Sequence, residues 1–157
     1  MQMKKYLIET FEFNDLMNKK VLGRMTELPD NQQCIRLFSH LVNSQNKWMA
    51  RILQYPQDPK LDWWEPIYTF DALEQEWNKS LRMWIEFIER KTEDDLEAET
   101  RFIGYDGGHW STRLKDIALQ LNYHSIHHRA QMQLRIRQQG LEPDFVDYIG
   151  TVSRKIT

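Results

Sequence analysis

Apolar side chains recur along this chain at alternating intervals of three and four residues, and this spacing restricts its fold more than any other feature. The pattern covers residues 4–26, 30–53, 71–90 and 111–139. Side chains at such intervals share one face of an α-helix and are buried together. Six Gly and five Pro in 157 residues are few for a turn-rich β protein. The sequence therefore predicts an all-α protein with four long helices.

Stretches that disfavour helix separate these segments. Three prolines restrict the backbone of residues 55–68, which predicts a long loop between the second and third helices. The stretch 100–111 contains Asp106-Gly107-Gly108, which suits the tight turn of a short hairpin or an extended loop. Residues 142–148 are expected to form a single helical turn that packs back on the long helices.

Two of the predicted helices begin near acidic residues that suit an N-terminal cap. Asp30 is followed three residues later by Gln33, and Asp71 is followed at the same interval by Glu74. In a capping arrangement of this kind, the two side chains bond to free backbone N–H groups in the first helical turn. We therefore expect side-chain caps at the start of the second and third long helices.

The length of 157 residues is typical of one compact domain, so we expect a single domain over residues 1–157. Four long helices with one long connection between the second and third predict a four-helix bundle. The periodicity alone does not give the direction in which each helix runs.

Composition narrows the function classes. The formal net charge is −2, so the chain lacks the basic excess of a duplex-binding protein, and we expect no nucleic-acid partner. Its one cysteine, Cys34, cannot form an internal disulfide, and the N-terminus does not resemble a signal peptide. No apolar run approaches the roughly 20 residues of a membrane span. We therefore expect a cytoplasmic protein with no membrane partner.

Histidines replace apolar residues on the inward face of the last long helix. Leu121 is followed on that face by His124 and His128, which lie four residues apart and can bind one metal together. His40 occupies a core-facing position of the second helix, from which it can reach the same point. Three neutral imidazoles would hold a divalent cation and leave positions open. Alternatively, these histidines are ordinary hydrogen-bonded residues of the core.

Other notable side chains have weaker interpretations. His127 lies about 100° round the helix from His128 and should point toward solvent or a neighbouring polar group, and His109 is given no ligand role. Trp63 and Trp64 either roof a substrate pocket or cover the end of the bundle, and the second interpretation is favoured. The basic residues of the last helix are expected to form a solvated face: Arg113, Lys115, Arg129, Arg135 and Arg137.

The stretch Asn122-Tyr123-His124-Ser125-Ile126-His127-His128-Arg129-Ala130-Gln131, with His40 upstream and Gly140 and Pro143 downstream, resembles the DinB/YfiT-like superfamily. The resemblance covers nearly the whole chain, and Ala130 stands where the family often has Gly. It implies an up-down-down-up four-helix bundle with the long crossover at residues 55–68. It also implies that His40, His124 and His128 are the three metal ligands.

Members with assigned activities are metal-dependent transferases or isomerases that use a low-molecular-weight thiol. The resemblance therefore implies a divalent transition metal, zinc or nickel first and iron as a further option, together with a small-molecule substrate and such a thiol. It also implies a homodimer formed through helix faces. Two alternatives stay open: a metal-dependent hydrolase on the same site, and a non-catalytic bundle that binds a ligand or partner.

No catalytic residue is named from the sequence. A general acid or base would have to come from polar groups around the histidines, whose orientation depends on the geometry of the bundle. The candidates for such supporting groups are Glu12, Asn14, Asp15, Asp116 and Gln120.

Overall fold

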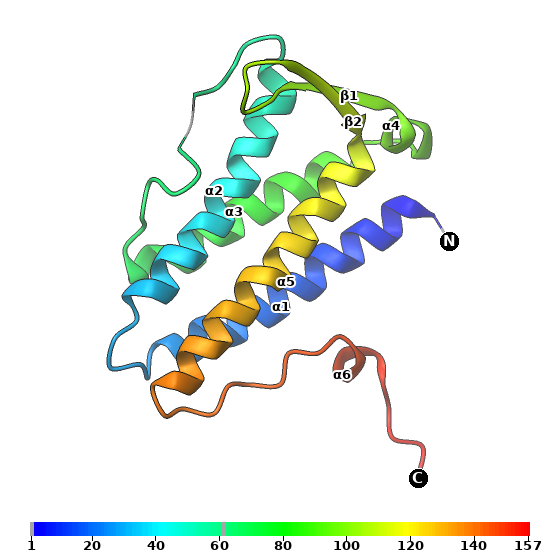
Figure 1. The fold of residues 1–157 in the computed structure, drawn as a ribbon. Helices are drawn as coiled ribbons and strands as arrows, with labels where there is room; N and C mark the ends of the chain where they lie inside the picture. The colour runs from blue at the N-terminus through cyan, green and yellow to red at the C-terminus, as the bar shows by residue number, and fades with distance from the viewer. Residues whose placement is uncertain (1, 61) are drawn as a thin grey trace.

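The computed structural model describes residues 2–60 and 62–157. The protein is mainly helical, with one two-stranded antiparallel sheet (Figure 1). The elements follow the order α1 (Met3–Met25), α2 (Gln32–Gln54), α3 (Phe70–Glu89), α4 (Glu93–Glu97), β1 (Glu99–Ile103), β2 (His109–Arg113), α5 (Leu114–Gln138) and α6 (Ile149–Val152).

The four long helices expected from the apolar spacing are α1, α2, α3 and α5. Their bounds differ from the expected ones by at most three residues, and the largest shift is the start of α5 at 114 instead of 111. The stretch expected to form a hairpin or extended loop is a hairpin, in which Glu99 pairs with Arg113 and Ile103 with His109. The prediction of a mainly helical protein is confirmed.

The long helices pack so that α1 and α2 each contact both α3 and α5 (Figure 1). Large aromatic side chains fill the space between them. Trp84 stacks on Phe11 with ring centroids 6.1 Å apart, and Trp77 meets Phe38 edge-on at 5.6 Å. Both indole N–H groups find acceptors, the Asp15 carboxylate for Trp77 and a backbone carbonyl for Trp84. Burying these rings is therefore favourable, because it leaves neither indole N–H without a partner.

The expected helix caps are wrong. The residues at the N-terminal boundaries of α2 and α3 are Asn31 and Thr69, and neither side chain makes a capping hydrogen bond. Asp30 accepts instead from the backbone N–H of Gln32, two residues on, at 3.0 Å. This local turn uses the carboxylate before the helix begins, so no capping box forms.

A capping box occurs instead at α4, a short helix that the sequence analysis did not predict. The Thr92 side chain accepts from the backbone of Asp95, and the Asp95 carboxylate accepts from the backbone of Thr92. The adjacent Glu93 carboxylate accepts from the backbone N–H groups of Met3 and Lys4 at 2.9 and 3.1 Å. It thereby satisfies free N–H groups at the start of α1 and joins two elements that are distant in sequence.

The stretch 142–148 packs back on the long helices but does not form the expected helical turn. Its residues are irregular, and the short helix α6 follows them. A residue before proline avoids the α conformation, which disfavours helix at the start of this stretch. Asp144 pairs with Arg24 of α1 at 3.1 Å and accepts through its carbonyl from Gln133 of α5. These contacts with two helices hold the stretch in an irregular, non-helical conformation.

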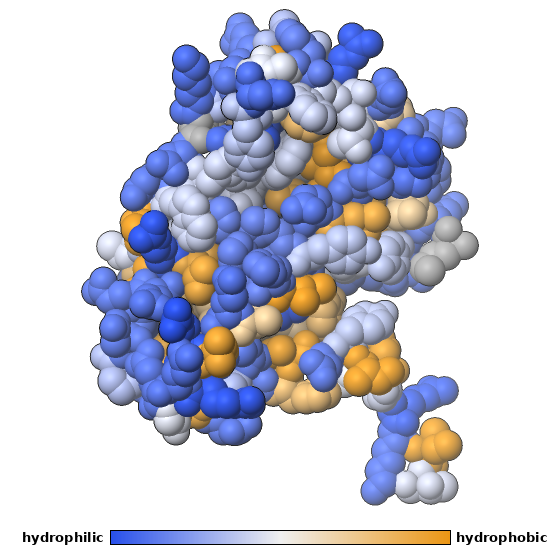
Figure 2. Space-filling view, in the orientation of Figure 1, coloured by the Kyte–Doolittle hydropathy of each residue, from blue (hydrophilic) through white to orange (hydrophobic). Residues whose placement is uncertain are grey.

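Residues 147–157 are exposed, and the segment after α6 runs away from the long helices (Figures 1 and 2). The face seen in Figure 2 is mostly hydrophilic, with apolar patches between polar ones. Among the described residues, no helix combines the length and apolar character needed to cross a membrane.

Candidate metal centre

Packing of α2 against α5 brings together the three histidines singled out in the sequence. His40 comes from α2, and His124 and His128 lie one turn apart on α5. One ring nitrogen of each lies within 4.8 Å of the corresponding atoms of the other two. The Nε2 atoms of His40 and His124 are 2.9 Å apart. The three-histidine cluster can therefore present its nitrogens to a single ion.

A backbone carbonyl sets the orientation of His40. Its Nδ1 lies 2.8 Å from the carbonyl oxygen of Trp63. Because a carbonyl oxygen only accepts, Nδ1 carries the proton and Nε2 keeps the lone pair that a metal needs. The ring of Trp64 stacks on His40 at 3.9 Å, with an angle of 11° between the planes. The long loop thus fixes both the tautomer and the tilt of this imidazole.

The side chain of Gln131 sets the tautomer of His128. Its side-chain oxygen lies 2.7 Å from His128 Nδ1, so that nitrogen donates and Nε2 is free. The amide nitrogen of Gln131 lies 3.5 Å from Nε2 of His127, which is exposed as expected. The sequence carried a signal for Gln131, because it follows His128 by three residues on the same helix. It carried none for Trp63, whose contribution is a backbone carbonyl in an irregular loop.

Burial keeps the cluster neutral. Desolvation lowers the pKa of His40 and His128, and it lowers the pKa of His124 to about 4, with smaller contributions from the neighbouring histidines. Neutral imidazoles have free lone pairs at pH 7. In a tetrahedral zinc site, nitrogens 2.0–2.1 Å from the ion lie about 3.3 Å from one another. One pair of nitrogens in this cluster is 2.9 Å apart and all three lie within 4.8 Å of one another, a range that includes that value, so three neutral imidazoles placed in this way fit a transition metal.

The supporting groups proposed from the sequence do not contact the cluster in the described part of the chain. Glu12, Asp116 and Gln120 are exposed. Asp15 accepts from Trp77 and pairs with Lys19. The sequence pattern could not exclude these residues because helical position alone does not show which neighbouring helix a side chain faces.

Asn14, the fifth of those candidates, belongs to a buried polar network around Arg129. Arg129 is 2% exposed and donates to the side-chain oxygens of Asn14 and Asn18 at 2.8 and 2.9 Å. The two amides in turn donate to Asn122 and Ser125 of α5. The expectation that Arg129 lies on a solvated face is therefore wrong. The reason is that α5 contacts both α1 and α2, so its buried arc is wider than one apolar stripe.

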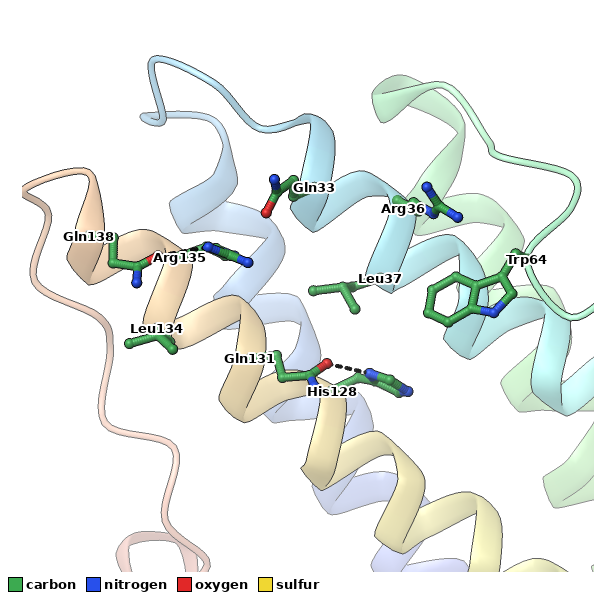
Figure 3. A pocket seen from close by; sticks show the side chains of 9 residues that line it. All are labelled: Gln33, Arg36, Leu37, Trp64, His128, Gln131, Leu134, Arg135 and Gln138. Carbon is green, nitrogen blue, oxygen red and sulfur yellow. Dashed lines mark hydrogen bonds between the residues drawn. The ribbon is translucent and has the colours of Figure 1, made fainter.

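The two tryptophans of the long loop have different surroundings. Trp64 lines a pocket of about 710 Å³ beside His128, between α2 and α5 (Figure 3). Trp63 instead lies under the cations of Lys47 and Arg51, at 4.3 and 4.9 Å from its ring centroid. The interpretation as a simple cover for the bundle end does not hold for Trp64, which forms a pocket wall. The ring of Trp63 packs against α2, and its backbone carbonyl orients His40.

His109 lies apart from the cluster, consistent with its having no ligand role. It sits at the start of β2, and its Nδ1 is 3.0 Å from the hydroxyl of Tyr55 at the end of α2. This hydrogen bond ties the hairpin to the beginning of the long loop.

The fold and the site define a class: a mainly helical protein with a three-histidine cluster open to a pocket between two helices. A family profile described as the DinB superfamily matches residues 19–132, which is more than half of the chain. The chain therefore belongs to the DinB superfamily. The match includes all three histidines of the cluster and Gln131. Searches of curated proteins and of solved structures found no significant match.

Proposed function

We propose that this protein is a metal-dependent enzyme that transfers a small thiol to an electrophilic substrate. The observation that carries the proposal is the three-histidine cluster, whose neutral nitrogens face one point at the edge of a pocket. A divalent metal held there, with zinc or nickel the first candidates, would lower the pKa of a thiol or a water that reaches it. Membership of the DinB superfamily supports the same proposal.

The chain's own residues prepare the site. His40, His124 and His128 would hold the metal, and the Trp63 carbonyl and the Gln131 amide keep two of them in the correct tautomer. The Trp64 ring covers one face of His40 and excludes water from that side.

The thiol must come from a separate molecule. Cys34, the one cysteine of the chain, is 1% exposed, and burial raises its pKa to about 11. A buried protonated thiol is a poor nucleophile. A thiol-transfer reaction at this site therefore needs a small thiol that enters through the pocket.

Three finer predictions accompany the proposal. We propose that the four long helices form the up-down-down-up bundle implied by the family resemblance, which the adjacency of α2 and α5 supports. The homodimer and the cytoplasmic location stay predictions. Light scattering on the purified protein tests for the homodimer, and cell fractionation tests the cytoplasmic location.

The first test is metal content. Tag-free wild-type protein and the variants His124→Ala, His128→Ala and His127→Ala are analysed by plasma mass spectrometry after soaking with zinc or nickel. We expect about one metal per chain in the wild type and its loss in the first two variants. His127→Ala is the matched control and should keep the metal, because its ring is exposed on the same helix. A metal-free wild type would overturn the proposal and favour a non-catalytic bundle.

The second test separates thiol transfer from hydrolysis. Metal-loaded protein is given electrophilic substrates, including activated esters, with and without a small thiol. Loss of thiol that depends on His124 supports transferase activity. Equal turnover of esters without thiol would show the hydrolase instead.

A further inference from the structure

The pocket beside the histidine cluster has a positive wall. Arg36 of α2 and Arg135 of α5 both line it, and no carboxylate of the described residues does. Neither arginine forms an ion pair within residues 2–60 and 62–157. The protein as a whole carries a net charge of −2, so two arginines without a carboxylate partner in one pocket are a local excess of positive charge, although Arg135 also donates to the side-chain oxygen of Gln138. Such a pocket favours an anionic ligand.

The distance between Arg135 and the histidine cluster sets the length of a ligand that contacts both. His128, Gln131 and Arg135 follow one another along one face of α5, and Figure 3 shows all three side chains directed toward α2. Seven residues of α-helix separate the first from the last, which corresponds to about 10 Å along the axis. A molecule that reaches from Arg135 to the cluster is therefore extended rather than compact.

The second arginine lies near the other end of the pocket. The guanidinium of Arg36 is 5.2 Å from the ring centroid of Trp64, which itself stacks on His40. Between the two arginines, Leu37 provides apolar contact surface (Figure 3). The pocket thus offers two cationic positions with an apolar stretch between them, in a volume of about 710 Å³ that suits a small molecule.

We propose that this pocket binds a small extended molecule with carboxylate groups, which Arg36 and Arg135 hold while its reactive end lies at His128. Planar guanidinium groups match the paired oxygens of carboxylates through two parallel hydrogen bonds, so Arg36 and Arg135 suit a ligand that carries such groups. The assignment of the reactive end rests on the proposed function, and the carboxylate contacts do not. In the context of that function, the cosubstrate is a small thiol that carries carboxylates.

The test uses S-methylglutathione, which has two carboxylates but no free thiol, and its diethyl ester, which has none. Binding is measured by calorimetry at low ionic strength, where exposed charges interact most strongly. The proteins are the wild type, the double variant Arg36→Gln with Arg135→Gln, and Arg137→Gln. Arg137 is the matched control, since it lies on α5 outside this pocket. We expect about tenfold weaker binding of the acid to the double variant and of the ester to the wild type.

The outcomes separate this proposal from the proposed function. His124→Ala should bind S-methylglutathione as the wild type does, because that probe needs no metal. If the wild type holds no metal but binds the acid in an arginine-dependent manner, the carboxylate pocket stands and the enzyme proposal fails. The pocket proposal is overturned if the wild type does not bind the acid, if acid and ester bind equally, or if the double variant binds as the wild type does.

Discussion

Gln131 controls the orientation of His128 through one hydrogen bond of 2.7 Å. Replacing it with Leu removes the acceptor and frees the imidazole to rotate or to change tautomer. Groups that hydrogen-bond to a metal ligand typically raise metal affinity about 10–100-fold. We therefore expect Gln131→Leu to weaken zinc affinity by about 10–100-fold. Competition with a chromophoric chelator measures the change.

Two variants control that prediction. Gln131→Glu retains an acceptor and should bind zinc about as well as the wild type. Gln120→Leu changes an exposed glutamine on the same helix and should have no effect. If Gln131→Leu bound zinc like the wild type, the amide would have no part in holding His128.

Arg129 is a buried cation that α1 and α5 share. Burial lowers its pKa to about 10, so it stays protonated at neutral pH. Arg129→Met leaves the side-chain oxygens of Asn14 and Asn18 without their donor. Because an unpaired buried acceptor costs about 1–3 kcal/mol, we expect a loss of about 2–4 kcal/mol in the free energy of unfolding. Urea denaturation measures it, with the exposed Arg137→Met as the control.

The burial of Arg129 could not be predicted from the pattern of apolar residues in α5. A charged residue next to His128 on a helix was expected to be solvated, and the apolar stripe of α5 gave no reason to bury it. A helix that contacts two neighbours buries a second face, and here that face is polar because asparagines of α1 lie opposite. The sequence contains those asparagines, but only the packing of α1 on α5 shows that they satisfy the guanidinium.

The reactivity of the Cys34 thiol should depend on pH in a way that reports its burial. Its pKa is raised from 9.0 to about 11 because burial disfavours the thiolate. Below pH 9 the native thiol should therefore contain about 100-fold less thiolate than a free one, and its reactivity should rise about tenfold per pH unit. Reaction with a colorimetric disulfide reagent measures this, and denatured protein should react fully. A native rate equal to that of free cysteine would contradict both the burial and the argument for a separate thiol.

A side chain caps the N-terminus of α4 but not that of α3, and two matched substitutions test this difference. Thr92→Ala removes the side-chain oxygen that accepts from Asp95, so we expect a loss of about 1 kcal/mol in the free energy of unfolding. Thr69→Ala is the matched control, because Thr69 occupies the same boundary position of α3 but makes no capping bond. Equal effects of the two substitutions in thermal denaturation would contradict the assignment of the cap.

The elements differ in how well the sequence predicts them, for a physical reason. Each long helix buries an apolar face, so the spacing of its apolar residues gives its position to within a few residues. The short helix α4 has a single buried side chain, Leu96, and five residues are too few for a period. Helix caps depend on the conformation of one residue, so Asp30 and Asp71 matched a capping pattern without forming one.

Distant segments of the chain meet at Arg51, which links the hairpin to the metal centre. Arg51 is 3% exposed, and its guanidinium faces Trp48 of α2, Trp63 of the long loop, and Phe102 and Tyr105 of the hairpin region at 4.9–5.9 Å. Trp63 in turn accepts from His40. The hairpin, the loop and α2 thus form one packed unit, which the carbonyl of Trp63 joins to the histidine cluster.

Arg51→Met tests this unit, because it keeps most of the side-chain volume but removes the charge that the four rings attract. Cation–ring contacts of desolvated groups contribute about 2 kcal/mol or more, so amides of β1 and β2 should exchange with solvent at least about tenfold faster. Amides of α1 and α3 should exchange as in the wild type, since the four rings around Arg51 belong to α2, the long loop and the hairpin region. Hydrogen exchange followed by mass spectrometry measures both, and the exposed Arg82→Met on α3 is the control. Unchanged exchange in the hairpin, or equal acceleration in α1, would show that Arg51 does not hold these segments together.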